Sequence, residues 1–315
     1  QYRQAVALQP DLIEAQVNLS LCLEEPGRLL ACMDHFQRML ARQPDSYIAL
    51  LRLTQAHMAL KEHDQAEDYV RRILAFKPDA LDALVLLACI ASGQGLNQRV
   101  LEISGQALAL GGGFGVGMSR VFHSLYTDDV GQAQLFELTR DWARQYIEIG
   151  PRENDTPEEY CFPNTSGIGR KLKIAYISRD FAKHSVSYFL EPLLKNHDKN
   201  NYVIYCYANL LHPDEVTPRF QKLADEWRDV ALVSDADVLK RIREDEIDIL
   251  VDLSGHTTGG RPSLLARKPA PLLVNYLGYP ATTGLAAVDY RLVDEMTDPP
   301  GEADQFHTEK LWRLP

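Results

Sequence analysis

The chain has 315 residues, of which 45% are hydrophobic and 24% are charged. This is the composition of a folded globular protein, and the length favours about two domains. The 33 Lys and Arg residues stand against 44 Asp and Glu, for a net charge of -11. That balance argues against duplex nucleic acid or an anionic membrane as the main partner. No apolar run reaches the roughly 18 residues of a membrane-spanning helix, so we expect no membrane partner.

The five cysteines are scattered along the chain and form no Cys-x-x-Cys pair. This spacing suits neither a zinc site nor a disulfide framework, and reduced thiols in the cytoplasm explain it most simply. We therefore expect a cytoplasmic protein. The chain opens at Gln1, partway through a repeat, and stops at Pro315 just after a predicted strand. On this pattern it is expected to be a piece of a longer protein.

The first third of the chain carries an internal repeat. Similar phrases end in Pro-Asp at Pro10, Pro44 and Pro78, which are 34 residues apart, the period of the tetratricopeptide repeat. The predicted all-α array covers 1–113, with units at 11–44, 45–78 and 79–112. In each unit the proline stops the second helix, and the following Asp can cap the next one.

One helical hairpin cannot bury its own apolar face, so neighbouring units must stack into a solenoid. Such solenoids commonly present a concave surface to peptide or protein segments, and we expect protein partners here. A spacer that binds nothing is the alternative. A helical stretch and an irregular connector rich in Gly, Pro and Asn follow, and together they form a predicted linker over 114–170.

The last segment, 171–315, alternates short apolar runs with helical patterns. Predicted strands cover 173–178, 202–207, 230–233, 247–253, 272–277 and 290–293. Predicted helices cover 185–196, 215–225, 237–244 and 262–267. This alternation predicts an α/β lobe with a mostly parallel, doubly wound sheet of Rossmann type.

Ligands of such folds bind beyond the carboxyl ends of the strands. Three predicted loops lie there: 179–184, 254–261 and 278–284. They predict a polar cleft lined by His184 and His256. Each loop also has a plainer interpretation, because a histidine after a strand is often a hydrogen-bonded loop residue and Asp180 suits a turn or a helix cap. The glycines of 254–261 allow a phosphate cradle, although the Walker lysine pattern is missing.

These loops carry a resemblance to a known family. The phrases KIAYISRDFAKH at 173–184, DILVDLSGHT at 248–257 and YLGYPATTG at 276–284 resemble the O-linked N-acetylglucosamine transferase/SPINDLY group, glycosyltransferase family 41. The match follows family order through 171–315 and corresponds to the amino-terminal catalytic lobe. The same family places tetratricopeptide repeats upstream.

The resemblance implies an inverting enzyme with two Rossmann-like lobes, a GT-B fold. It would move N-acetylglucosamine from UDP-GlcNAc to Ser or Thr of proteins, with no required metal and no cofactor beyond the nucleotide-sugar substrate. Asp180 and His184 fall on family positions considered for proton handling on the acceptor side. Leu277, Gly278 and Pro280 fall on the loop that faces the donor sugar and the acceptor. His256 and Ser185 are further candidates for substrate binding.

The sequence departs from the family pattern in several places. The usual His-Pro pair is His184-Ser185, and the next histidine of the motif is Tyr188. The histidine expected in the linker is absent, and His123 is out of register. The second, nucleotide-binding lobe is missing from 1–315, so these residues alone are expected to be inactive. Alternatives are a GDP-fucose donor, an Asn acceptor, or a non-catalytic tetratricopeptide scaffold.

Overall fold

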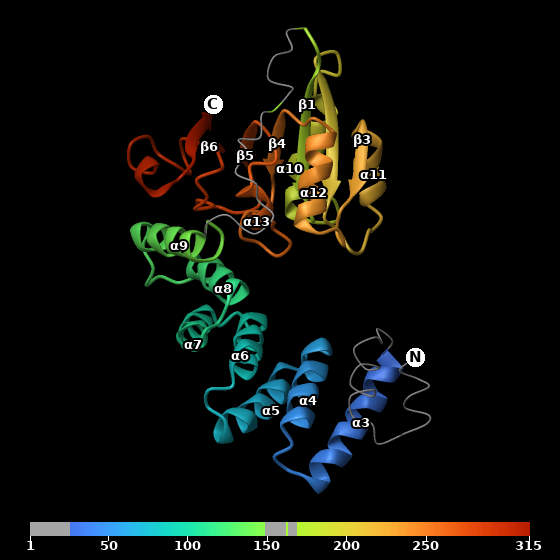
Figure 1. The fold of residues 1–315 in the computed structure, drawn as a ribbon, viewed down its shortest axis with the longest axis vertical. Helices are drawn as coiled ribbons and strands as arrows, with labels where there is room; N and C mark the ends of the chain where they lie inside the picture. Colours follow the sequence, from blue (N-terminus) through green and yellow to red (C-terminus); the bar gives the residue numbers. More distant parts are fainter. Residues whose placement is uncertain (1–25, 149–161, 163–168) are drawn as a thin grey trace. The chain divides into compact units, whose positions relative to one another are not determined.

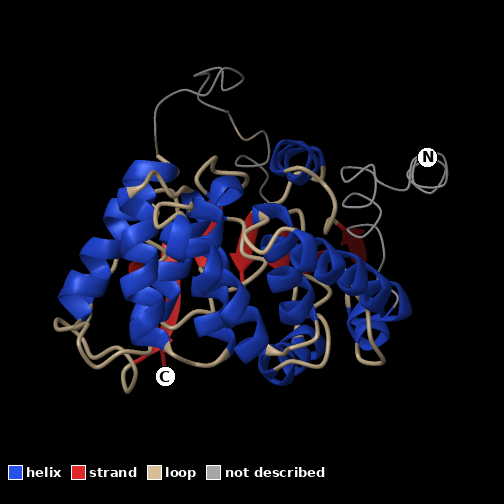
Figure 2. Ribbon diagram, turned by 90° about the horizontal axis from the view of Figure 1, so that it is seen from below, coloured by secondary structure: helices blue, strands red, loops and turns tan. Residues whose placement is uncertain are grey.

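A computed structural model describes residues 26–148, 162 and 169–315. The first helix of unit 11–44 and most of the predicted connector lie outside the described residues. The chain divides into two compact units, Gln1–Thr127 and Asp128–Pro315. In the described part of the first unit every regular element is a helix, and the described strands all lie in the second. Figure 2 colours the helices blue and the strands red.

The first unit is an array of helical hairpins (Figure 1). Its helices are α3 (Pro26–Arg42), α4 (Tyr47–Ala59), α5 (His63–Phe76), α6 (Leu81–Gly93), α7 (Asn97–Ala109) and α8 (Phe114–Ser124). Helix α4 packs on α5 and α6 on α7, and α8 then packs on α7. Apolar side chains of the second and third units form one buried cluster, which includes Leu50, Ala66, Val70, Ile73, Leu84, Leu87, Ala88, Val100 and Ala107.

Polar contacts join neighbouring hairpins of this array. The Glu67 carboxylate on α5 accepts a hydrogen bond from the Arg99 guanidinium on α7. This hydrogen bond holds the pKa of Glu67 below its usual value, because Arg99 stabilises the ionised form. The Tyr47 hydroxyl on α4 donates in the same way to Asp82 on α6. Stacking therefore rests on shared apolar surface and on a few fixed polar pairs.

The second unit begins with α9 (Gln132–Tyr146) and contains a seven-stranded parallel sheet of order β3-β2-β1-β4-β5-β6-β7. The strands are β1 (Leu172–Ser178), β2 (Tyr202–Ala208), β3 (Glu226–Asp229), β4 (Ile249–Asp252), β5 (Leu272–Asn275), β6 (Tyr290–Asp294) and β7 (Lys310–Leu314). The connecting helices are α10 (Ser185–Asn196), α11 (Thr217–Leu223), α12 (Asp235–Glu244) and α13 (Pro262–Leu265). A short 3-10 helix, η2 (Asp304–Phe306), precedes β7.

The strand order explains how the helices cover the sheet. From β1 the chain moves outward through β2 to β3, and then returns across the sheet to β4. Right-handed crossovers therefore place α10 and α11 on one face and α12 and α13 on the other. Leu190 and Leu194 of α10 and Phe220 of α11 pack with alternate side chains of β1 and β2 in a single core. The expected doubly wound lobe is confirmed.

The third strand differs from its prediction. The apolar run 230–233 was expected to form it, but β3 comprises the preceding four residues, Glu226–Asp229. This strand is the edge of the sheet and pairs with β2 alone. Edge strands tolerate polar side chains that discourage association with other chains. Leu232 of the predicted run is almost fully exposed instead.

Helix α9 belongs to this α/β unit through polar contacts with the loop after β5. The Arg140 guanidinium donates to the Gly284 carbonyl, and the backbone N–H of Ala286 donates to the Glu148 carboxylate at 3.0 Å. Among the described residues of both units, no helix is both long and apolar enough to cross a membrane.

Candidate active site

The three loops singled out from the sequence meet at one edge of the sheet. Strands β1 and β4 are neighbours, and the strand order reverses between them. In open α/β sheets this switch point, at the carboxyl ends of the strands, is where ligands bind. The loops after β1 and β4 touch there, because the aliphatic stem of Arg179 lies against Gly259. Figure 1 shows the central strands that position these loops.

Asp180 is held in place by the loop after β1. Its backbone N–H donates to the Ser178 hydroxyl at 2.9 Å, and its carbonyl accepts from the Ser187 hydroxyl at 2.9 Å. These bonds fold the loop back on the first turn of α10 and leave the side chain of Asp180 nearly buried. Burial raises the pKa of Asp180, and the nearby charges of His184 and Arg179 oppose that rise. The carboxylate is therefore more basic than an exposed one.

His184 is the residue that caps α10. Its Nδ1 accepts a hydrogen bond from the Val186 backbone N–H at 3.3 Å, and it lies 3.6 Å from Oδ2 of Asp180. Both the Val186 N–H and the Asp180 carboxylate therefore lie next to Nδ1. Because Nδ1 accepts here, the proton of the neutral ring is on Nε2; a ring that released the Val186 N–H and turned a protonated Nδ1 to Asp180 would leave Nε2 free to accept a proton. The side chain is 48% exposed, so a substrate can reach it.

The next residues of α10 are exposed as well. Ser185 begins the helix and is exposed beside His184. Tyr188, at the position where the resemblance leads us to expect a second histidine, lies one turn further on with 72% of its surface exposed. The structure therefore brings Asp180, His184 and Ser185 together, with an aromatic ring where the family pattern has an imidazole.

His256 is in a different environment. It is 2% exposed, and its ring lies edge-on between those of Trp142 and Tyr279, at centroid distances of 4.8 and 5.0 Å. Its Nε2 is 2.8 Å from the Thr283 carbonyl, which places the ring proton on that nitrogen. Burial lowers the pKa of His256 to about 4, so the ring is neutral at physiological pH. The prediction that His256 lines the cleft is therefore wrong, because its side chain is buried beneath the loops.

The loop after β5 passes very close to the loop after β4. A Cβ atom on Gly278 would lie 1.9 Å from the Leu253 carbonyl oxygen, so no other residue fits there. Leu277 has a φ of 67°, a left-handed conformation that is strained for a leucine. Pro280, two residues after Gly278, is exposed. Strain of this kind concentrates at functional sites, and here it coincides with the loop singled out by the resemblance.

A buried polar network supports these loops and was missed in the sequence. Asp252 ends β4 and accepts hydrogen bonds from the backbone N–H groups of Ser254 and Gly255, at 3.1 and 2.8 Å. Asn275 ends β5 and donates to the same carboxylate at 3.0 Å. Arg291 of β6 is buried, and it donates to the Asn275 side chain and to a loop carbonyl. The sequence signal that could have revealed this network is a polar residue inside or at the end of an apolar strand.

Several backbone N–H groups of the loop considered as a phosphate cradle, 254–261, are already paired within the protein. The Gly260 N–H donates to the Thr257 carbonyl at 3.0 Å, and α13 is a single turn of four residues. Arg261 is engaged within the protein, since it donates to Asp235 at 2.7 Å and to the Asn209 side chain at 2.9 Å. Hydrogen bonds within the loop and from Arg261 to the rest of the protein hold this loop in place.

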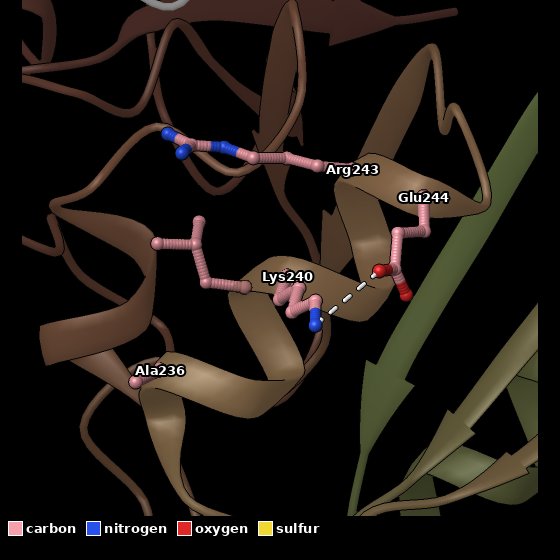
Figure 3. Close-up of a pocket in the computed structure, with 5 residues that line it drawn as sticks. Ala236, Lys240, Arg243 and Glu244 are labelled. Atoms are coloured by element: carbon pink, nitrogen blue, oxygen red, sulfur yellow. Dashed lines mark ion pairs between the residues drawn. The ribbon is translucent and has the colours of Figure 1, made fainter.

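A surface pocket on α12 is separate from these loops (Figure 3). It is lined by Ala236, Leu239, Lys240, Arg243 and Glu244. Lys240 and Glu244 form an ion pair at 3.7 Å across one turn of the helix. The lining contains one ion pair and the apolar side chains of Ala236 and Leu239, and it shares no residue with the loops at the carboxyl edge.

Comparisons with known proteins agree with this organisation. The model of glycosyl transferase family 41 matches residues 155–315, and a tetratricopeptide repeat model matches 25–88. A Solanum lycopersicum protein named probable UDP-N-acetylglucosamine–peptide N-acetylglucosaminyltransferase SPINDLY is 38% identical over 203 residues, which are 63% of this chain and 21% of that protein. A UDP-N-acetylglucosamine–peptide N-acetylglucosaminyltransferase of Caenorhabditis elegans is 34% identical over 151 residues, covering 47% of this chain and 13% of the relative.

Among solved structures, a mutant of the Thermobaculum terrenum O-GlcNAc transferase matches with a TM-score of 0.80 and 32% identity. The match covers 96% of this chain and 57% of that one. It confirms the expected fold class, a tetratricopeptide array followed by the Rossmann-like amino-terminal half of a GT-B fold. The chain spans about a fifth or less of the length of the curated relatives named above.

Proposed function

The chain belongs to glycosyl transferase family 41, and we propose that the full-length protein transfers N-acetylglucosamine from UDP-GlcNAc to Ser or Thr hydroxyls of other proteins, with inversion at the anomeric carbon. One observation carries the proposal. The three loops that resemble the family converge at the switch point of the sheet, with Asp180 and His184 side by side at its rim. The relatives named above are described as peptide N-acetylglucosaminyltransferases.

The acceptor hydroxyl loses its proton as it attacks the anomeric carbon, so the reaction needs a base or a relay nearby. His184 is exposed enough to reach an acceptor, and Asp180 is close enough to orient its ring. In the reactive state Nδ1–H faces Asp180 and Nε2 takes the proton. Asp180 then stabilises the imidazolium that forms, in the manner of a carboxylate behind a catalytic histidine.

The donor side calls for positive charge, because the leaving group is a nucleoside diphosphate. Arg179 and Lys183 flank Asp180 and His184, and both are exposed. They make the rim of the site attractive to an anionic donor. We assign Leu277, Gly278 and Pro280 to the wall that faces the sugar and the acceptor, since their loop borders the same edge. Ser185 is assigned to substrate binding next to His184.

The repeat array is proposed to bind the protein substrate. Its hairpins stack in the way that gives solenoids an extended binding surface. Two binding sites on one chain raise the effective concentration of the acceptor segment. Protein acceptors should therefore be used at least about tenfold more efficiently than short Ser- or Thr-containing peptides cut from them.

The experiment is sugar transfer by the full-length protein with a mixture of protein acceptors. Labelled UDP-GlcNAc and GDP-fucose are supplied in parallel, beside an Asp180→Asn, His184→Ala double variant and a His212→Ala control at an exposed histidine. We expect label from UDP-GlcNAc, base-labile as O-linked sugar is, and a loss of at least about a hundredfold in the double variant. Label from GDP-fucose alone would show that the donor is GDP-fucose and not UDP-GlcNAc. Label that resists base would show that the acceptor residue is Asn. If neither donor gives label and the protein still captures partner proteins, the non-catalytic scaffold is the remaining interpretation.

A further inference from the structure

A buried carboxylate lies beneath the loop after β5. Glu309 immediately precedes β7 and is 4% exposed. Its Oε2 accepts from the Thr282 hydroxyl at 2.6 Å, and its Oε1 accepts from the Thr283 backbone N–H at 2.6 Å. The Thr283 hydroxyl donates to Oε1 as well. One side chain from the end of the sheet thus gathers three donors of a loop on which Gly278 and Pro280 also lie.

The hydrogen bonds of Thr282 and Thr283 together need an acceptor at both side-chain oxygens of Glu309. A hydroxyl has one proton to donate and two lone pairs. Both lone pairs of Thr282 are used, because Oγ1 accepts from the Gly284 N–H at 3.1 Å and from the Thr308 N–H at 3.2 Å. Its proton is left for Glu309. A glutamine in place of Glu309 would turn an NH2 group toward Thr282 or would give up the bonds to Thr283.

The arrangement reaches His256 through one further residue. Glu309 holds the amide and the hydroxyl of Thr283, so the orientation of that residue is fixed. The Thr283 carbonyl accepts from Nε2 of His256 at 2.8 Å. His256 in turn belongs to the loop after β4 and is packed against Trp142 and Tyr279. Glu309 is therefore linked to the loop after β4 through Thr283, whose carbonyl accepts from the Nε2–H of His256.

Arg291 provides the balancing charge. Arg291 is buried like Glu309. Burial lowers the pKa of Arg291, and the negative charge of Glu309 opposes that lowering. Arg291 donates to the Tyr279 carbonyl at 2.6 Å, at the other end of the same loop. The loop after β5 is thus held at two points, Tyr279 and the Thr282–Thr283 pair, by side chains from β6 and from the residue before β7.

We propose that Glu309 is a positioning residue for the active site. It does not touch the substrate; it fixes the conformation of the loop that carries Leu277, Gly278 and Pro280, and through Thr283 it fixes His256. The kinetic part of this inference rests on the proposed function, whereas the conformational part does not.

The conformational test uses the 315-residue chain and needs no activity. Glu309→Gln and Thr283→Val are compared with wild type by amide hydrogen exchange and by ring ¹⁵N spectra of His256. Glu302→Gln, an exposed glutamate of the same segment, is the control. Loss of a hydrogen bond to a charged group should speed exchange in 282–285 and 255–260 by about 10- to 100-fold, with α10 unchanged. The His256 spectrum should also change from a single Nε2–H tautomer to a mixture.

The kinetic test uses the full-length protein. Glu309→Gln and Thr283→Val should lower kcat at least about tenfold, while the KM for protein acceptors stays within about twofold. Thr283→Ser, which keeps the hydroxyl, should restore both exchange and kcat.

Unchanged exchange and an unchanged His256 spectrum in folded Glu309→Gln would overturn the inference. If that variant fails to fold, Thr283→Val decides by the same criteria. Faster exchange with full kcat would overturn the positioning role. A wild type that transfers no sugar refutes the proposed function instead, and exchange alone then decides whether Glu309 holds the loops.

Discussion

The neutrality of buried His256 predicts how the stability of the α/β unit depends on pH. Burial lowers the pKa of His256 from 6.5 to about 4, although the Thr283 carbonyl and the charge of Glu309 both favour protonation. In the unfolded chain the same imidazole regains its ordinary pKa. Between these two values the unfolded chain binds a proton that the folded chain does not. The free energy of unfolding therefore falls as the pH decreases from about 6.5 to about 4.

The size of the effect follows from the two pKa values. A proton bound by the unfolded chain alone costs about 2 kcal/mol of stability at a pH of about 5, relative to a pH of about 7.5. For a domain whose total stability is about 5–15 kcal/mol, this is easily measured. The perturbation is His256→Asn, which removes the titrating ring. Asn also loses the packing against Trp142 and Tyr279, so the variant is less stable at every pH.

The assay is urea unfolding followed by tryptophan fluorescence. All three tryptophans, Trp142, Trp227 and Trp312, lie in the second unit, so the signal reports on that unit alone. The difference in free energy between wild type and His256→Asn should shrink by about 2 kcal/mol between a pH of about 7.5 and about 5. His212→Asn, at an exposed histidine, should leave the slope of wild type intact. A wild type-to-variant difference that stays constant within about 0.5 kcal/mol would refute the assignment of a buried neutral ring.

Two further predictions concern packing in each unit. Gly278→Ala should destabilise the second unit by about 2–3 kcal/mol in the same fluorescence assay, because its Cβ would meet the Leu253 carbonyl; Gly131→Ala, where nothing lies within 4 Å, should cost no more than about 1 kcal/mol. Equal losses would contradict the close approach. In the array, Glu67→Ala should speed amide exchange in α7 about tenfold by removing the partner of Arg99. Exchange at wild-type rates would show that the Glu67–Arg99 pair does not help to hold the hairpins together.

Much of the fold could be predicted from local patterns. Helix α10 begins and ends at the predicted residues, because it follows a polar loop and its apolar positions recur with helical spacing. β1 and β2 match their predictions within one residue at each end, since both are continuous apolar runs buried in the middle of the sheet. The prediction of β3 was wrong because an edge strand needs no apolar run. Its position in the sequence is set by pairing with β2.

The candidate site was predictable in outline and not in depth. Parallel strands bring their carboxyl ends to one edge, so the three loops could be grouped from the order of the strands along the chain. Their packing could not be foreseen, because His256 is buried by Trp142 from a helix far upstream. Arg291 lies in β6 and Glu309 immediately precedes β7. The sequence shows Arg291 as a charged residue in an apolar run and Glu309 as one polar residue between Thr308 and Lys310. Local pattern cannot reveal which loop such a charge will hold.

The proposed sugar-facing wall and the proposed base have different physical requirements, and different parts of the structure suit each. The loops after β4 and β5 share contacts so close that neither can shift alone, as the Gly278–Leu253 approach and the His256–Thr283 hydrogen bond show. Such a wall can orient a sugar without paying an ordering cost at each turnover. A base, by contrast, must exchange hydrogen-bond partners during the reaction. His184 is exposed, and its Nδ1 lies between a backbone donor and a carboxylate, so it can do this while the wall stays fixed.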